Sequence, residues 1–519
     1  MLVNLRKSLF SPLTIVGWLL FGVCLLLHTQ SSYLLLLTVA QLVFVPATLQ
    51  IIIPIKRWHM PIILTGMLAV TSLHIWNEGL AAILFAFVYL LYTAFVAYLG
   101  INRFMRRGFT NMAEIAIDVG LIYLCIGGLW FFAYIANIDT GFSPLITWLT
   151  AIHFHYSAFL FAISVGLFGR LCTTRLYTPI TLIVLAGPLL VAIGISFSRI
   201  VEVVSVMLYI GAIYALFFLA LRARFHNIWQ AIFIRISFGT LCLTILWSLL
   251  YAIGNASGHI MISIDRMIVL HGFFNCILFG LFSVLGWSLE PPSTKQLPWT
   301  FPVSHIRGKL TTTGEPHPGL VDHLDAFVDT ISLPKAITHF YENTGQYQLF
   351  ASVKWRAWFK PFAIFYKLIS TRTQQLNLPL SQKEVEMTGT ITTISENEDG
   401  RIKPRAWIRK VDAQTTFVAL YSKHQTAQTT YMNIALPLPY STMVGILKLN
   451  SHDGQLSLTS QDGGDTGIYL AFRSNLIKLP LHEHFTITAS NEKTLSATHQ
   501  MWIFGLPFLN IHYRILRKD

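Results

Sequence analysis

Two apolar stretches of the chain contain side chains that can do chemistry. His153, His155 and Tyr156 lie within the run 145–161, and His271 and Asn275 lie within the run 267–278. Imidazole and amide groups are costly to place in hydrocarbon, so inside a membrane segment they mark a functional site or an internal polar contact. We expect these five residues to contribute to a substrate-binding site.

Imidazole groups can orient a carbonyl or hydroxyl group and can move protons near neutral pH. His271 and Asn275 are four residues apart and share a helix face. His153 and His155 are about 200° apart around a helix, so only one of them can join that pair, and the other should bond a neighbouring helix. A transition metal normally needs a third or fourth ligand, and none stands out, so we predict neither a metal nor another cofactor.

The composition separates a membrane part from a water-exposed part. The 519 residues are 54% hydrophobic and only 12% charged, whereas a soluble chain is roughly one quarter charged. Residues 1–290 hold 21 charged side chains and residues 291–519 hold 40. The net charge of +13 points to anionic lipid headgroups. Nucleic acid is not expected as a partner, because no basic run or nucleic-acid motif accompanies the charge.

The first part predicts an α-helical membrane bundle. Apolar runs of about 17–27 residues recur about ten times, and each is long enough to cross a bilayer as a helix. The five cysteines all lie in or beside these runs, which implies no disulfide framework. The expected spans are 12–28, 33–55, 60–76, 80–101, 114–138, 143–169, 176–197, 200–221, 228–254 and 266–289.

The basic residues of the short loops predict an orientation. Alternate loops, counted from the N-terminus, hold eleven Lys and Arg residues, whereas the opposite loops hold only Arg199 and Arg266. Because basic loops stay inside, both termini should be cytoplasmic and the number of spans should be even. At 1.5 Å per residue, the histidines of the sixth span then lie about 15–18 Å from its outer end, and His271 and Asn275 lie about 8–14 Å along the tenth. The groups therefore share a depth.

The second part changes to a different pattern. Residues 291–330 are rich in Pro, Thr and His and predict a linker. A short helix is expected near 333–343, and a period of two between about 384 and 515 predicts eight to ten antiparallel strands. We therefore expect residues 331–519 to form a cytoplasmic helix-plus-β domain. The run His482-Glu483-His484 has no evident third metal ligand nearby, which favours a solvated turn.

One segment of this domain mixes aromatic and basic residues. Seven aromatic side chains lie between residues 350 and 368, and Pro361 should break or bend any helix there. Two interpretations are open: an anchor at the membrane interface, held by anionic headgroups, or a core helix with a cationic outer face. The basic residues concerned are Lys354, Arg356, Lys360 and Lys367.

The two histidine motifs resemble those of a known family. The run Leu149-Thr-Ala-Ile-His-Phe-His-Tyr-Ser-Ala-Phe159, followed by His271-Gly-Phe-Phe-Asn275, resembles the YndJ-like family of bacterial membrane proteins, best across 115–290. The chain reads Ser157-Ala158 and Cys276 where Ala-Gly and Ala are expected. The resemblance implies a bacterial polytopic membrane protein of the cell (inner) membrane, often described as a transporter. It supplies no reaction.

These observations support three hypotheses. The first is binding or transport of a small amphiphilic, lipid-like molecule through the His153/His155/His271/Asn275 pocket, with Tyr156 beside it. An antiparallel β domain often encloses an apolar ligand, which agrees with that hypothesis. The second is an intramembrane enzyme that uses histidine acid–base chemistry on a lipid or isoprenoid substrate. The third is a membrane-anchored interaction protein whose polar network is only structural.

The orientation is directly testable. We expect that green fluorescent protein fused after Pro292 will fluoresce and that alkaline phosphatase fused at the same point will be inactive, because the loop charges place residues 291–519 in the cytoplasm. Active phosphatase together with a dark fluorescent fusion would reverse the orientation and the depths assigned to the histidines.

Overall fold

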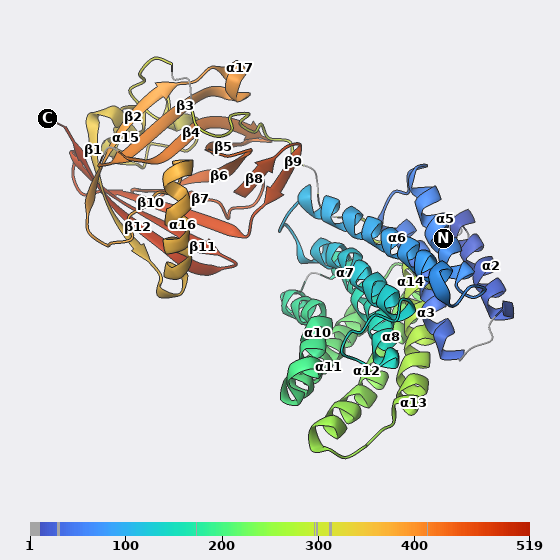
Figure 1. The fold of residues 1–519 in the computed structure, drawn as a ribbon. Coiled ribbons are helices and arrows are strands. Elements are labelled where there is room, and N and C mark those ends of the chain that lie inside the picture. The colour runs from blue at the N-terminus through green and yellow to red at the C-terminus, as the bar shows by residue number, and fades with distance from the viewer. Residues whose placement is uncertain are drawn as a thin grey trace. The chain divides into compact units, whose positions relative to one another are not determined.

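The chain forms two compact units of different architecture. The computed structural model describes residues 11–27, 32–172, 174–294, 296, 299–310, 314–412 and 414–518. Arg6 and Lys7, which contribute to the predicted orientation, lie outside the described residues. One unit comprises Met1–Phe104 and Thr110–Gln296, and the other comprises Met105–Phe109 and Leu297–Asp519. Among the described residues the first unit is helical, and the second carries the strands (Figure 1).

The helical unit contains eight candidate membrane spans among its described residues, judged by length and composition. Two further apolar helices, α2 (Pro12–Leu27) and α5 (His59–Ser72), are shorter than the roughly 20 residues that a crossing requires. They account for the difference from the ten predicted. The eight spans are Leu35–Ile52, α6 (Gly79–Met105), α7 (Met112–Ile135), Pro144–Leu171, α10 (Tyr177–Phe197), α11 (Arg199–Arg222), α12 (Ile228–Ser257) and Ile264–Leu289.

Three spans change from α-helix to π-helix part-way along. A π-helical turn holds an extra residue, and such turns are frequent at functional sites. Both spans that carry the predicted site residues contain one. The segments are η1 (Ser32–Leu34, a 3₁₀ turn), α3 (Leu35–Val39), η2 (Ala40–Phe44) and α4 (Val45–Ile52); α8 (Pro144–His153), η3 (Phe154–Leu160) and α9 (Phe161–Leu171); and α13 (Ile264–Met267), η4 (Ile268–Phe273), η5 (Asn275–Leu281) and α14 (Phe282–Leu289).

Local sequence explains where several of these helices begin. The side chains of Asn111, Ser143, Ser198, Asn227 and Ser263 each accept a hydrogen bond from a backbone N–H of the first turn. Such caps satisfy donors that would otherwise have no partner within the helix. The caps at Ser143 and Ser263 precede the two spans that carry the histidine motifs.

A buried ion network joins helices at one end of the unit. Glu114 on α7 is 1% exposed and accepts from Arg103 on α6 at 2.8 Å and from Arg170 on α9 at 2.8 Å. Arg103 also donates to Asp118 at 2.9 Å and to the Ile52 carbonyl at 2.8 Å. Arg170 donates to the Pro292 carbonyl at 2.8 Å. The network therefore fixes α4, α6, α7 and α9 and the chain after α14 to one another.

Arg235 binds backbone carbonyls rather than Asp118. The sequence allows a pair between the two, because both are expected toward the inner ends of their spans, but Asp118 is bound to Arg103. Arg235 on α12 instead donates to the carbonyls of Ala220, Leu221 and Ala223. These groups lie at the end of α11, where carbonyls lack helical partners and a cation is favourable.

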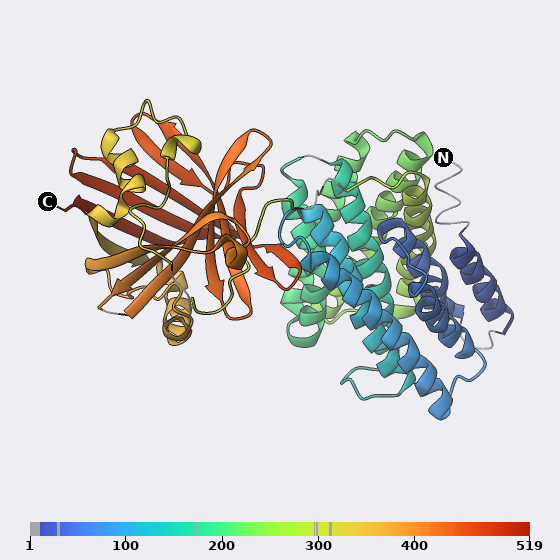
Figure 2. The same cartoon turned by 90° about the horizontal axis from the view of Figure 1, so that it is seen from above.

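The second unit is built on a ten-stranded antiparallel β-barrel. The strand order is β5-β4-β3-β2-β1-β12-β11-β10-β7-β6, and β5 also pairs with β6, which closes the barrel (Figures 1 and 2). The strands are β1 (Tyr347–Trp355), β2 (Val385–Thr393), β3 (Ile402–Val411), β4 (Gln414–Thr426), β5 (Thr429–Leu438), β6 (Ser441–His452), β7 (Gln455–Thr459), β8 (Gly467–Phe472), β9 (Asn475–Lys478), β10 (Leu481–Ala489), β11 (Thr494–Ile503) and β12 (Leu506–Arg517).

Strands β8 and β9 lie outside the closed ring. β6 is long enough to pair with β8 through Ser441–Ile446 and with β7 through Lys448–His452, and β9 pairs with β8. Closure leaves the short β9 as an edge, which is how natural sheets limit edge-to-edge association. The predicted antiparallel β domain is confirmed.

Short helices and part of the predicted linker cover the barrel. Phe301 and Leu324 are buried, and Ser304 donates to buried Asp399 at 2.7 Å. Residues from 299 onward in the segment 291–330 therefore pack on the barrel where they are described. The helical pieces are η6 (Leu324–Ala326), α15 (Lys335–Glu342), η7 (Thr344–Gln346), η8 (Ala357–Phe359), α16 (Lys360–Thr373) and α17 (Glu396–Asp399).

The ion network generates a stability prediction. Glu114→Gln leaves two arginines facing an uncharged amide, and breaking a buried pair typically costs about 3–5 kcal/mol. We expect a large drop in thermal stability of the full chain in nanodiscs. Glu78 is exposed, so Glu78→Gln should stay within about 0.5 kcal/mol of the wild type. Equal melting of the two variants would show that the network does not hold the helices together.

Candidate functional site in the helical unit

His153 is the last residue of α8 and presents an open nitrogen. Its Nδ1 lies 2.6 Å from the Leu149 carbonyl. A carbonyl can only accept, so Nδ1 carries the hydrogen and Nε2 is left with a lone pair. Among the described residues, Nε2 has no hydrogen-bond partner, and the side chain is exposed on the protein surface.

His271 is held from two sides. Its Nδ1 donates to the Thr244 carbonyl at 2.9 Å and lies 3.2 Å from the Ser248 hydroxyl. Its Nε2 faces the Asn275 amide nitrogen at 3.3 Å, while the Thr244 hydroxyl donates to Asn275 Oδ1 at 2.6 Å. Two α12 side chains and one α12 carbonyl therefore orient the His271–Asn275 pair.

The structure brings His153 and His271 together. Their ring centroids are 6.2 Å apart, with an angle of 26° between the ring planes. The prediction that one histidine of the earlier span lies within reach of the later pair is confirmed. His271 and Asn275 are half-buried, so the cluster opens at the surface of the helical unit. This differs from the prediction of a site wholly inside the unit, which rests on the cost of exposing imidazole to lipid.

His155 points away from this cluster, as expected for a residue two positions from His153. It is 1% exposed, with Nδ1 on the Ala151 carbonyl at 2.8 Å and Nε2 on the Tyr89 hydroxyl at 2.7 Å. A Cβ atom on Gly127 of α7 would lie 2.8 Å from the His155 ring. His155 is therefore enclosed and joins its span to α6.

Tyr156 also makes a contact between helices. Its hydroxyl donates to the Leu36 carbonyl of α3 at 2.7 Å, and the side chain is 6% exposed. Glycine is not required at Gly272, beside His271, because a Cβ atom there would lie 3.9 Å from Leu36, an ordinary van der Waals distance. Of the five predicted site residues, His153, His271 and Asn275 thus form one cluster, while His155 and Tyr156 lie in the packed interior.

The cluster can accept a hydrogen bond and can take up a proton. Two nearly parallel imidazoles lie side by side, and only His153 has an unused ring nitrogen. No group of three or more His, Cys, Asp or Glu side chains that could hold a metal occurs among the described residues. A ligand that offers a hydroxyl, amine or protonated acid would match the open Nε2.

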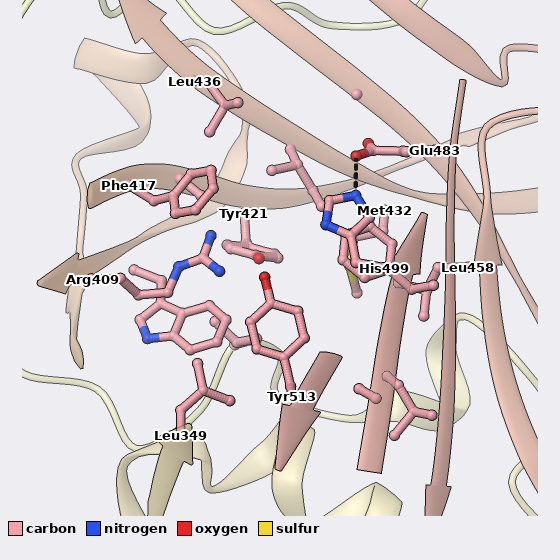
Figure 3. Close-up of a pocket in the computed structure, with 18 of the residues that line it drawn as sticks. Leu349, Arg409, Phe417, Tyr421, Met432, Leu436, Leu458, Glu483, His499 and Tyr513 are labelled. Atoms are coloured by element: carbon pink, nitrogen blue, oxygen red, sulfur yellow. Dashed lines mark hydrogen bonds and ion pairs between the residues drawn. The ribbon is translucent and has the colours of Figure 1, made fainter. Parts of the chain in front are cut away.

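The barrel contains a cavity, and most of its polar lining residues are not expected from the sequence. It measures about 120 Å³ and is lined mostly by apolar side chains. Its polar groups include Arg409, Tyr421, Glu483, His499 and Tyr513 (Figure 3). The only signal for them in the sequence is the alternation of residues along a strand. Glu483 faces the cavity, and its neighbours His482 and His484 therefore face outward. All three belong to β10, so the expected solvated turn is wrong.

Helix α16 excludes one of the two interpretations of its sequence. Pro361 is in its first turn, where proline is tolerated, so it does not break the helix. Phe362, Phe365 and Leu368 are 61%, 67% and 71% exposed, so the core-helix interpretation is wrong. Lys367 donates to Asn377 Oδ1 at 2.6 Å, and only Lys354, Arg356 and Lys360 of the basic set are exposed.

Comparison with known proteins agrees with the motif resemblance. The family model described as YndJ-like protein matches residues 35–279. The chain is 38% identical over 454 residues to the uncharacterized membrane protein YndJ of Bacillus subtilis (strain 168), an alignment that covers 83% of each protein. No solved structure matches the chain. With its family motifs in membrane-type helices, this chain is a multi-pass membrane protein that belongs to the YndJ-like family.

Proposed function

We propose that the protein binds a small amphiphilic, lipid-like molecule at the cluster of His153, His271 and Asn275, and transports it. The observation that carries the proposal is the open Nε2 of His153, exposed beside the His271 ring. A polar acceptor inside a membrane span is costly unless something bonds to it, and a ligand headgroup would supply that bond.

The surroundings of the cluster favour a ligand that enters from the bilayer. Phe274, three residues after His271 and therefore on a neighbouring side of the same span, is 41% exposed. An apolar body could lie along this ring while its polar head reaches the imidazoles. A solute without an apolar part would gain nothing from that surface. The protein would act in the bacterial cell membrane with both termini in the cytoplasm.

A second candidate function is intramembrane acid–base catalysis on a lipid or isoprenoid substrate. The observation that favours it is the close approach of two imidazoles, of which one has an unused basic nitrogen. A histidine in that state can remove a proton from a substrate. The two candidates differ in outcome, because only catalysis would alter the bound molecule covalently.

Helix α16 provides a second proposed contact with lipid, at the bilayer surface. Its exposed phenylalanines and leucine would enter the interfacial region, and Lys354, Arg356 and Lys360 would meet anionic headgroups. The occupant is a bilayer because the chain is itself a membrane protein, so a lipid surface is always near. The charge and the apolar face of the helix both suit that partner.

The binding site can be tested with a clickable diazirine derivative of a long-chain alcohol, added to the full chain in nanodiscs. We expect cross-links on peptides from 144–160 and 264–289, and we expect His153→Ala to lower their yield about tenfold, the effect of roughly one hydrogen bond to the ligand. His153→Ala should melt like the wild type because its side chain is exposed. Mass spectrometry of the adduct also detects any covalent change of the probe.

The matched control is His155→Ala, which removes an enclosed imidazole two residues away. It should leave the Tyr89 hydroxyl unpaired and lower stability by about 1–3 kcal/mol, with no specific loss of cross-linking in the folded fraction. Unchanged cross-linking in His153→Ala, or equal loss in both variants, would contradict a binding role for His153 and leave a structural network.

The membrane contact of α16 predicts a lipid-dependent environment for its exposed face. A nitroxide placed at Leu368→Cys, in a full chain whose native cysteines are replaced by Ala, should become accessible to oxygen and protected from a water-soluble nickel reagent in anionic nanodiscs. The triple change of Lys354, Arg356 and Lys360 to Gln should remove most of that protection, since each basic group contributes about 1 kcal/mol. A label at exposed Tyr440 serves as the control. Full nickel access at position 368 would reject the contact.

A further inference from the structure

The barrel interior holds a guanidinium group without an acidic partner. Arg409 on β3 is 9% exposed, and its Nε has no hydrogen-bond partner. No carboxylate of the described residues lies within ion-pair distance of it. The guanidinium lies instead over the Trp407 ring at 4.4 Å and the Phe417 ring at 4.3 Å.

Two other buried arginines of this unit are paired with acids. Arg401 donates to Asp399 at 2.6 Å and to the Asn433 side chain at 2.8 Å, and Arg405 forms an ion pair with Asp322. Burying a charge is expensive unless an opposite charge and hydrogen bonds offset the loss of water. Contacts with aromatic rings offset only part of that loss. Arg409 therefore has unused capacity for an anion.

The groups around Arg409 are hydrogen-bond donors. Figure 3 shows the hydroxyls of Tyr421 and Tyr513 on the side of the cavity where the guanidinium lies. Burial raises the pKa of Tyr421 to about 12 and also raises the pKa of Tyr513. Both hydroxyls consequently keep their protons at neutral pH. A fork of guanidinium N–H groups with two phenolic O–H groups suits an anionic oxygen cluster.

The carboxylate in the same cavity is already engaged. Glu483 on β10 pairs with His499 on β11, with 3.1 Å between Oε2 and Nε2 (Figure 3). The His499 ring stacks on Phe485 with 3.7 Å between centroids, which fixes the pair. The cavity thus has a basic region at Arg409, while the Glu483 carboxylate is bonded to His499 rather than to the guanidinium.

The remaining lining is apolar and narrow. It includes Leu349, Met432, Leu436 and Leu458, and the cavity volume is about 120 Å³. A cavity of about 150 Å³ admits a benzene ring, so this smaller cavity has room for the head and the first carbons of a slender chain but not for a fused ring system. A pocket of this kind, apolar with a few convergent polar groups, is typical of a small-molecule site.

We propose that the barrel binds a single-chain amphiphile through its anionic head, a carboxylate or a phosphate monoester, with Arg409 as the headgroup ligand and Tyr421 and Tyr513 as supporting donors. The apolar chain lies along the leucine and methionine side chains of the cavity. This site is separate from the histidine cluster and does not depend on it, so either proposal can fail alone.

The test is calorimetric titration of the full chain in zwitterionic nanodiscs with water-soluble eight-carbon probes, after subtraction of empty nanodiscs. Octanoate and octyl phosphate should each bind saturably, one per chain, and the tighter of the two identifies the head. Octanol should bind at least tenfold more weakly, and octyltrimethylammonium should not bind. Equal binding of octanoate and octanol, or no saturable binding of either anion, would overturn the proposal.

Substitution of Arg409 gives two readouts of opposite sign. Arg409→Met keeps an unbranched apolar chain between the two rings, so it should lose octanoate binding at least tenfold while the melting temperature of the unliganded protein rises. Arg409→Lys should retain part of the affinity. Arg514→Gln, which removes an exposed arginine, is the matched control and should bind octanoate normally.

A cavity-filling variant protects the test against a folding defect. Ala497 lines the cavity, so Ala497→Phe should abolish binding of octanoate and octanol alike. Octanoate should raise the melting temperature of the wild type and of Arg514→Gln but not of Arg409→Met. Octanoate binding that survives in both Arg409→Met and Ala497→Phe would place the probe elsewhere and reject the barrel site.

Discussion

The helical unit depends on one buried carboxylate. Glu114 is shared between Arg103 and Arg170, which come from different helices, and each arginine also binds a backbone carbonyl from another segment. Hydrophobic burial cannot choose between helix arrangements inside lipid, because lipid tails are as apolar as the side chains. The polar network supplies directional bonds that an apolar interface lacks, and it sets which helices are neighbours of the span that carries His153.

Buried charge is treated differently in different places of the chain. Arg103, Arg170 and Arg401 each meet an acid, which is the arrangement expected for a structural role. Arg409 meets two aromatic rings and two hydroxyls instead, and His153 keeps an unused ring nitrogen. These two departures are what distinguish candidate ligand groups from structural ones, since a protein rarely leaves a costly polar group unsatisfied without a use for it.

Much of the architecture was predictable, because hydrophobic period and turn chemistry are local. The period of two that starts near residue 384 is matched by β2 (Val385–Thr393), and Gly400 and Gly454 lie at turns with positive φ. The opposite faces of His153 and His155 also followed from helix geometry. Partners between distant segments were not predictable. The sequence around Arg235 does not show that this arginine donates to the carbonyls of α11. The sequence around Asp118 does not show that its ion-pair partner is Arg103.

The barrel interior shows the same limit. The run Arg405-Ala-Trp-Ile-Arg409 reads as a solvated strand, because arginine is usually exposed. Alternation groups Arg405, Trp407 and Arg409 on one face but does not say which face is inside. Only the closure of β5 onto β6 decides that. At helix α16 the aromatic residues left a core helix open as one interpretation, because aromatic residues usually indicate a core, and the exposure of Phe362 and Phe365 excludes it.

The π-helical segment η3 has a consequence for the length of its span. It stands between His153 at the end of α8 and Arg170 near the end of α9. Each residue advances a helix by about 100°, so the extra residue of a π turn sets the rotational phase between the two ends. Loss of one residue there would turn Arg170 away from Glu114 whenever His153 still faced His271. The rotational positions of His153 and Arg170 are therefore coupled. Within η3 a substitution is tolerable, whereas the insertion or deletion of a single residue is not.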